Sequence, residues 1–237
     1  QVIRSIDTPI VADRGGANEY PNSIALKSGV LVVGSQRANS YAGSVYIFKD
    51  QSGTFVQSKK LVGAVASGYF GASVSTDGSK IAIGAPGDFN AKGVVYIVDA
   101  NTYNITDSIS SPGPMHGGFG LSVALSGSLL AVGAPGEVGY EDTVKGNLFT
   151  YKYSTSWSSA SNILSSSSTK SGMAVTTQTG VSATITLSDG AELGRSISIY
   201  NGRVLVGAPG NLNGANTVGI AFLLSADLTA MQSLQNI

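Results

Sequence analysis

His116 is the only histidine of the 237 residues, and it lies in the run Pro112-Gly-Pro-Met-His-Gly-Gly118. A histidine acts as a catalytic base when a nucleophile and an orienting group lie beside it. The neighbouring glycines and prolines indicate a loop tip instead. The chain has no cysteine, which excludes thiolate nucleophiles, disulfides and cysteine-ligated metals.

Other catalytic patterns are equally sparse. The serines include no Gly-x-Ser-x-Gly elbow, the turn that exposes the nucleophile of many hydrolases. Glu141 and Asp142 are neighbours in sequence, so in an extended segment their side chains point to opposite faces, whereas a hydrolytic pair must converge. We therefore expect no catalytic residues and predict that the chain is not an enzyme.

Oxygen ligands for a cation are few. The weak candidates follow the recurring Gly-Ala-Pro strings described below, and they are Asp88, Asn90, Glu137 and Asp142. Calcium takes about six to eight oxygens, several of them from carboxylates. Solvated loop residues are the alternative interpretation, so we expect no cofactor and leave calcium open.

Aromatic side chains are the better indication of binding. Five of them are expected in loops at one edge of the fold, namely Tyr41, Phe89, Tyr140, Tyr69 and Tyr20. A tyrosine there can stack on a sugar or anchor a protein contact. The alternative is that these rings only cap the ends of strands.

The elements that would position these loops repeat along the chain. Four copies of one apolar string end in a glycine, at Gly34, Gly84, Gly133 and Gly207. Thirteen residues before the last three stand Gly71, Gly120 and Gly194, whereas the first copy is degenerate there and reads Pro21-Asn22. A repeat of about 50 residues with glycine-rich turns and without helical periodicity predicts four strands per unit.

The string before each motif glycine is apolar on both faces. In the second copy Ile81 and Ile83 alternate with Ala82, and successive residues of a strand point to opposite faces. No helix is predicted that could cover either face, so sheets must stack on both sides. We therefore predict an all-β fold, a β-propeller of about four to five four-stranded blades.

The pattern Phe-Gly, thirteen residues, Gly-Ala-Pro and then Gly-x-Val-Tyr-x-Phe resembles the FG-GAP repeat of integrin α-subunit propellers and of many secreted or surface proteins. The resemblance covers residues 22–150 and 193–225. It implies a propeller with an extracellular or cell-surface location. The calcium loop of the integrin repeat would fall in the hairpins 75–80, 125–129 and 200–203, which hold at most one carboxylate each, so the family's metal residues are not carried over.

The domain organisation follows from the repeat. We predict one domain, 1–237, with units at 22–64, 70–112, 119–165 and 193–237. Residues 166–192 form an extra hairpin or half-blade, and residues 1–10 form a strand that closes the last blade. Exposed sheet edges would otherwise recruit a second chain.

Charge and hydropathy narrow the range of partners. The net charge is +0, which gives no reason to expect nucleic acid, and no stretch approaches the ~20 apolar residues of a spanning helix, so we expect no membrane insertion. The predicted function is an adhesion propeller or a structural subunit of a larger assembly, with a lectin-like carbohydrate binder as the alternative. The expected partners are proteins, glycans, or further copies in an oligomer or filament.

Overall fold

The computed structural model describes residues 20–113, 115–136, 146–158, 161–162, 173–176, 182–185, 187, 190–210, 212–213, 216–217, 219–225 and 231–234. The predicted closing strand 1–10 lies outside these ranges. In the described part of the chain no helix is long and apolar enough to cross a membrane.

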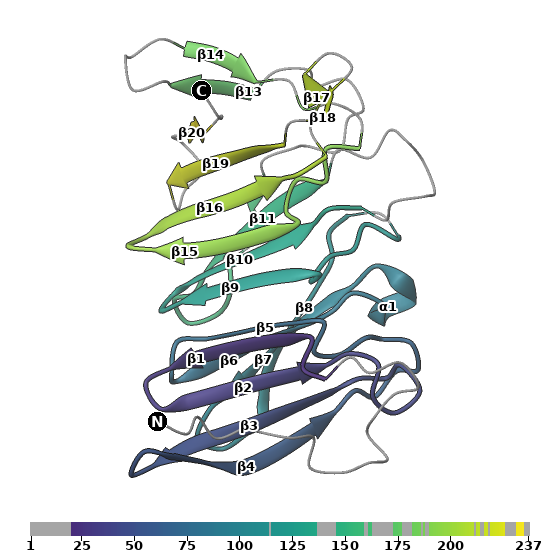
Figure 1. Cartoon of the computed structure of the whole chain (residues 1–237), viewed down its shortest axis with the longest axis vertical. Helices are drawn as coiled ribbons and strands as arrows, with labels where there is room; N and C mark the ends of the chain where they lie inside the picture. Colours follow the sequence, from purple (N-terminus) through teal and green to yellow (C-terminus); the bar gives the residue numbers. More distant parts are fainter. Residues whose placement is uncertain are drawn as a thin grey trace.

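Four antiparallel four-stranded sheets make up most of the structure (Figure 1). The first sheet consists of β1 (Ser23–Lys27), β2 (Val30–Ser35), β3 (Ser44–Gln51) and β4 (Thr54–Val62). The second consists of β5 (Ser73–Thr76), β6 (Lys80–Ala85), β7 (Val94–Asp99) and β8 (Ile105–Ser110). The third consists of β9 (Ser122–Ser126), β10 (Leu129–Ala134), β11 (Asn147–Lys152) and β12 (Ser161–Asn162). The fourth consists of β15 (Ser196–Tyr200), β16 (Arg203–Ala208), β19 (Ile220–Ser225) and β20 (Met231–Leu234).

Two short hairpins and one turn lie outside these sheets. A hairpin pairs β13 (Met173–Thr176) with β14 (Ser182–Ile185), in the segment expected to form an extra hairpin or half-blade. A second small hairpin pairs β17 (Leu212–Asn213) with β18 (Asn216–Thr217). The turn named α1 (Asp88–Ala91) follows β6.

The sheets fan out from a common centre. The first strand of each sheet contacts the first strand of the next, in the order β1, β5, β9 and β15. The outer strands β4 and β20 lie at opposite ends of the molecule in Figure 1, and the second and third sheets lie between them. This is the arrangement of successive propeller blades, and the all-β propeller prediction is confirmed.

Burial explains why the motif strand is apolar on both faces. In β6, Ile81 and Ile83 are fully buried in a cluster with Val32 and Ile47 of the first sheet. Ala82 of the same strand is buried in a different cluster, with Val132 of the third sheet. Each inner blade is therefore covered by a neighbour on both sides.

A serine and two glycines repeat at each contact between blades. The Ser23 hydroxyl of β1 donates to the Gly71 carbonyl oxygen of the next blade at 2.9 Å. The same bond joins Ser73 to Gly120 at 2.7 Å and Ser122 to Gly194 at 2.5 Å. That carbonyl lies against the motif glycine of the serine's own blade, where a Cβ would overlap it. The motif glycine is thus required because backbone from the next blade approaches it closely.

Before its first strand, each of the second, third and fourth blades has a phenylalanine or leucine followed by glycine. The first blade has a different pair at this position. Phe70 packs edge-on against Tyr96, and Phe119 packs edge-on against Phe149, both at 5.5 Å between ring centroids. Tyr20 makes the matching contact with Tyr46, at 5.6 Å. Tyr20-Pro21 therefore occupies the place of Phe70-Gly71, which resolves the copy that is degenerate in sequence.

Candidate functional site

One edge of the fan collects the loops that follow the motif strands and the segments that lead from one blade into the next. Loops 36–43, 63–72, 86–93 and 111–121, the last described except for residue 114, all emerge there, at the right of Figure 1 where α1 is drawn. We call this edge the loop rim, and it is defined by these four segments. The short hairpin turns of each blade lie at the opposite edge.

Two of the rim loops contain the same unusual turn. Asn39, Ser40 and Tyr41 have φ values of 51°, 55° and 67°, and three residues of the second blade, Phe89, Asn90 and Ala91, have φ values of 54°, 56° and 60°. Left-handed backbone costs a residue other than glycine about 1–2 kcal/mol, and normally it occurs singly. The short turn α1 is therefore left-handed, and its counterpart in the first blade repeats it. Backbone conformations with this energetic cost, at corresponding surface positions of two blades, are typical of functional loops.

The first of these turns carries an exposed tyrosine, Tyr41, which contacts the half-buried Tyr69. Tyr41 is 45% exposed, and its ring lies edge-on to that of Tyr69, with centroids 5.9 Å apart. The Tyr69 amide donates to the Tyr41 carbonyl at 3.0 Å. Because Tyr69 belongs to the segment entering the second blade, two blades together build this aromatic surface.

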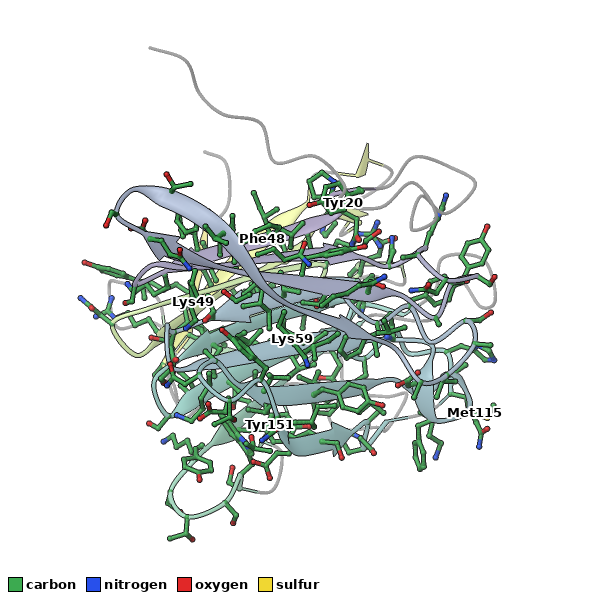
Figure 2. The ribbon with its side chains drawn as sticks, turned by 90° about the horizontal axis from the view of Figure 1, so that it is seen from below. Tyr20, Phe48, Lys49, Lys59, Met115 and Tyr151 are labelled. Carbon is green, nitrogen blue, oxygen red and sulfur yellow. The ribbon has the colours of Figure 1, made fainter. Side chains whose placement is uncertain are left out.

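The second turn presents an aromatic ring beside a cation. Phe89 is 52% exposed, and the Lys92 ammonium lies 5.7 Å from its ring centroid. His116, which also lies on the rim, donates its backbone amide to the Ala91 carbonyl at 2.7 Å. Its neighbour Met115 is exposed and appears at the rim edge in Figure 2. Lys92 and Met115 were not expected from the sequence, and only the glycine- and proline-rich run around Met115 hints at a surface loop.

A buried carboxylate holds the second turn in place. Asp88 is buried, and its carboxylate accepts a hydrogen bond from the Tyr96 hydroxyl at 2.5 Å. Burial raises the pKa of Asp88, and the hydrogen bond from Tyr96 opposes that rise. Burial likewise raises the pKa of Tyr96, with a further contribution from the hydrogen bond to Asp88. Gly68 makes room for this carboxylate, since a Cβ there would overlap it.

The candidate metal ligands do not come together in the part of the chain that the structure describes. Asp88 is buried whereas Asn90, two residues on, is exposed. Glu137, Asp142 and the candidate binding residue Tyr140 lie outside the described residues. No group of three or more His, Asp or Glu side chains is found among the residues described. In the hairpin after β5, Asp77 instead accepts the backbone amides of Ser79 and Lys80, each at 2.8 Å.

The four candidate aromatic residues that the structure describes therefore do not all lie together. Tyr41, Tyr69 and Phe89 lie on the loop rim, the first two in contact. Tyr20 instead packs on Tyr46 at the face of the first sheet that points away from the second. Figure 2 shows Tyr20 and Phe48 on that side, opposite the third-sheet residue Tyr151.

Comparison with known proteins adds information about the fold. No protein-family model and no curated protein sequence matches the chain, so the FG-GAP resemblance stays a prediction. Among solved structures, the chain is similar to a europium-containing methanol dehydrogenase, with a TM-score of 0.53 and 13% identity over 93% of this chain and 42% of that one. It is also similar to a mutant Aleuria aurantia lectin in complex with alpha-methyl-L-fucoside, with a TM-score of 0.52 and 15% identity over 86% of this chain and 55% of that one. The chain thus spans about half the length of these two structures.

The first of these similarities corrects the prediction that the chain is not an enzyme. A methanol dehydrogenase shares this fold over most of the chain, so the propeller architecture gives no ground for excluding catalysis. The prediction was wrong because a propeller positions loops and does not dictate what their side chains do. At 13% identity the similarity concerns the fold alone and transfers no activity.

Proposed function

We propose that this chain is an extracellular or cell-surface propeller that acts in adhesion by binding carbohydrate at its loop rim. The observation that carries the proposal is the repetition of one feature in two blades. Corresponding left-handed turns each carry an exposed aromatic ring, Tyr41 at the third position of the first-blade turn and Phe89 at the first position of the second-blade turn.

The chemistry of the rim suits a sugar. Exposed aromatic faces stack on the apolar C–H side of a pyranose ring, and polar groups around them fix its orientation. Lys92 beside Phe89 and the exposed Asn90 supply hydrogen-bond donors. The similarity to a fucoside-binding lectin supports the same ligand class and makes fucosides the first probes to use.

The test is a glycan array followed by calorimetry with α-methyl fucoside and with each hit. We expect saturable binding that Tyr41→Ala and Phe89→Ala each weaken about five- to thirtyfold, because removing a stacked ring costs roughly 1–2 kcal/mol. Tyr200→Ala is the matched control, since Tyr200 is 77% exposed but lies at the hairpin edge of the fourth sheet. An array without hits, or equal losses in all three variants, would refute the proposal.

A further inference from the structure

In the described part of the chain no other sheet packs on one apolar face of the first sheet. Val33, Tyr46 and Phe48 of this face are buried under Tyr20 and Phe55, but its β1 side is exposed. Ile24 and Leu26 of β1 are 68% and 61% exposed. By register on the motif strand, their counterparts are Val74 and Thr76 in the second blade and Val123 and Leu125 in the third, all of them buried against the preceding blade. The exposed face of the first sheet is therefore the same face with which each later blade packs against the blade before it.

The fourth sheet has the complementary surface. Leu205 of β16 is 39% exposed, whereas its counterparts Val32, Ala82 and Ala131 are fully buried against the following blade. Its strand partners Ser198 and Leu223 are exposed and half-buried respectively. The two uncovered faces are thus the two halves of a contact that the molecule already makes three times.

The serine and glycine contact is also incomplete at the fourth blade. Ser196 and Gly207 correspond to Ser23 and Gly34 of the first blade. In the described part of the chain, no carbonyl oxygen from another blade lies against this pair, and a Cβ at Gly207 would meet only atoms of Ser196, from its own blade. If a first blade packed on the fourth, the residue in the place of Gly71 would be Pro21, which is exposed.

The two exposed faces also carry residues of opposite charge at matching positions. At the second contact Lys80 lies over the ring of Tyr153, with 5.4 Å between the ammonium and the centroid. The register places Arg203 at the position of Lys80, and Asp50 at the position of Tyr153. Arg203 and Asp50 are both exposed. Joining the fourth sheet to a first sheet would therefore bring an arginine and an aspartate together.

We infer that two copies of this chain join head to tail, with the fourth sheet of each copy packed on the first sheet of the other. The chain spans 42% and 55% of the two similar propellers, so a second copy has the size needed to complete a ring. Two such contacts related by a twofold axis close the assembly and leave no further face open. This inference is independent of the carbohydrate proposal, because neither Tyr41 nor Phe89 takes part.

The experiment is sedimentation velocity on the full chain over a wide range of concentrations. We expect a concentration-dependent dimer. Ile24→Asp and Leu205→Asp each place a charge in the apolar contact, and each should weaken self-association about 100-fold, about tenfold for each of the two contacts in the closed pair. Ile105→Asp is the control, since Ile105 is 53% exposed on the outer strand β8 and lies on neither face; it should leave the dimer unchanged.

A charge exchange identifies the orientation of the contact. Arg203→Glu and Asp50→Arg should each weaken the dimer, and the double variant should restore it, because the arginine and glutamate then face each other again. Thermal unfolding of each variant checks that the monomer is intact. A protein that stays monomeric throughout, a dimer insensitive to Ile24→Asp and Leu205→Asp, or a double variant weaker than both single variants would overturn the inference.

Discussion

The contact between blades makes a sharp prediction at Gly84. A Cβ at this position would overlap the Gly120 carbonyl oxygen and lie 2.5 Å from the Ser73 hydroxyl oxygen. The carbonyl belongs to rigid backbone of the next blade, so Gly84→Ala must push the second and third blades apart. Overpacking of this kind costs about 1–3 kcal/mol, and disturbing the buried bond from Ser73 to Gly120 adds about 1 kcal/mol.

Gly207→Ala is the matched control within the same motif. A Cβ there would meet only atoms of Ser196, with its hydroxyl oxygen at 2.5 Å, and an exposed serine can rotate away. We expect a loss below about 1 kcal/mol for this variant in dilute solution. The difference in stability loss between the two variants therefore measures the effect of the close approach of the next blade, separately from any general effect of alanine in the strand.

Thermal unfolding of both variants measures the effect. A loss of about 3 kcal/mol corresponds to a Tm lower by about 9 °C in a chain of this length, at about 3 °C per kcal/mol. Adding Ser73→Ala to Gly84→Ala should not restore stability, because the overlap with the Gly120 carbonyl remains. Equal Tm losses for Gly84→Ala and Gly207→Ala would show that the close approach does not determine stability.

Two carboxylates give pH-dependent predictions of opposite sign. Although burial raises the pKa of Asp77, hydrogen bonds from the backbone amides of Lys80 and Ser79 hold it below 3.8; its stabilisation is therefore present above pH 3.8 and lost at lower pH. Asp77→Ala should cost about 1 kcal/mol in urea unfolding at pH 7 and nothing near pH 2, and an equal cost at both pH values would contradict this. Asp88 has a raised pKa because it is buried, so its contribution to stability falls as the pH rises above 3.8 towards the folded-state pKa. Asp88→Asn keeps an acceptor for Tyr96 and should remove that part of the pH dependence, which unfolding curves between pH 3 and 7 will show as a flatter profile than that of the native chain.

The repeat was readable from the sequence because its physical causes are local. Ile81, Ala82 and Ile83 have apolar side chains on both faces of one short strand, and only stacked sheets satisfy that pattern. The motif glycines indicated a close approach, but not which atom approaches. That atom is a carbonyl oxygen of the next blade, which lies 48 residues from the serine in the bond from Ser23 to Gly71 and 72 residues away in the bond from Ser122 to Gly194. A single sequence carries no signal for such a partner.

The site was less accessible to sequence reasoning. The left-handed turns at Tyr41 and Phe89 contain no glycine at their central positions, so turn propensities give no indication of them. Tyr20 looked like another rim tyrosine because it precedes a strand, as Tyr69 does. In the structure Tyr20 takes the place of Phe70 and packs on Tyr46, a role that becomes visible only when the blades are superimposed by strand register.

The repeated bond from a serine to the glycine of the next blade has a consequence for how such chains change in length. Since each unit contacts only its immediate neighbours, stability is close to a sum of unit and junction contributions. A duplication that copies one whole unit, with its serine and both glycines, supplies every atom needed for the new junction. Duplication of one unit in the gene can therefore lengthen this protein by one blade, and deletion of one unit can shorten it, without a new type of interface.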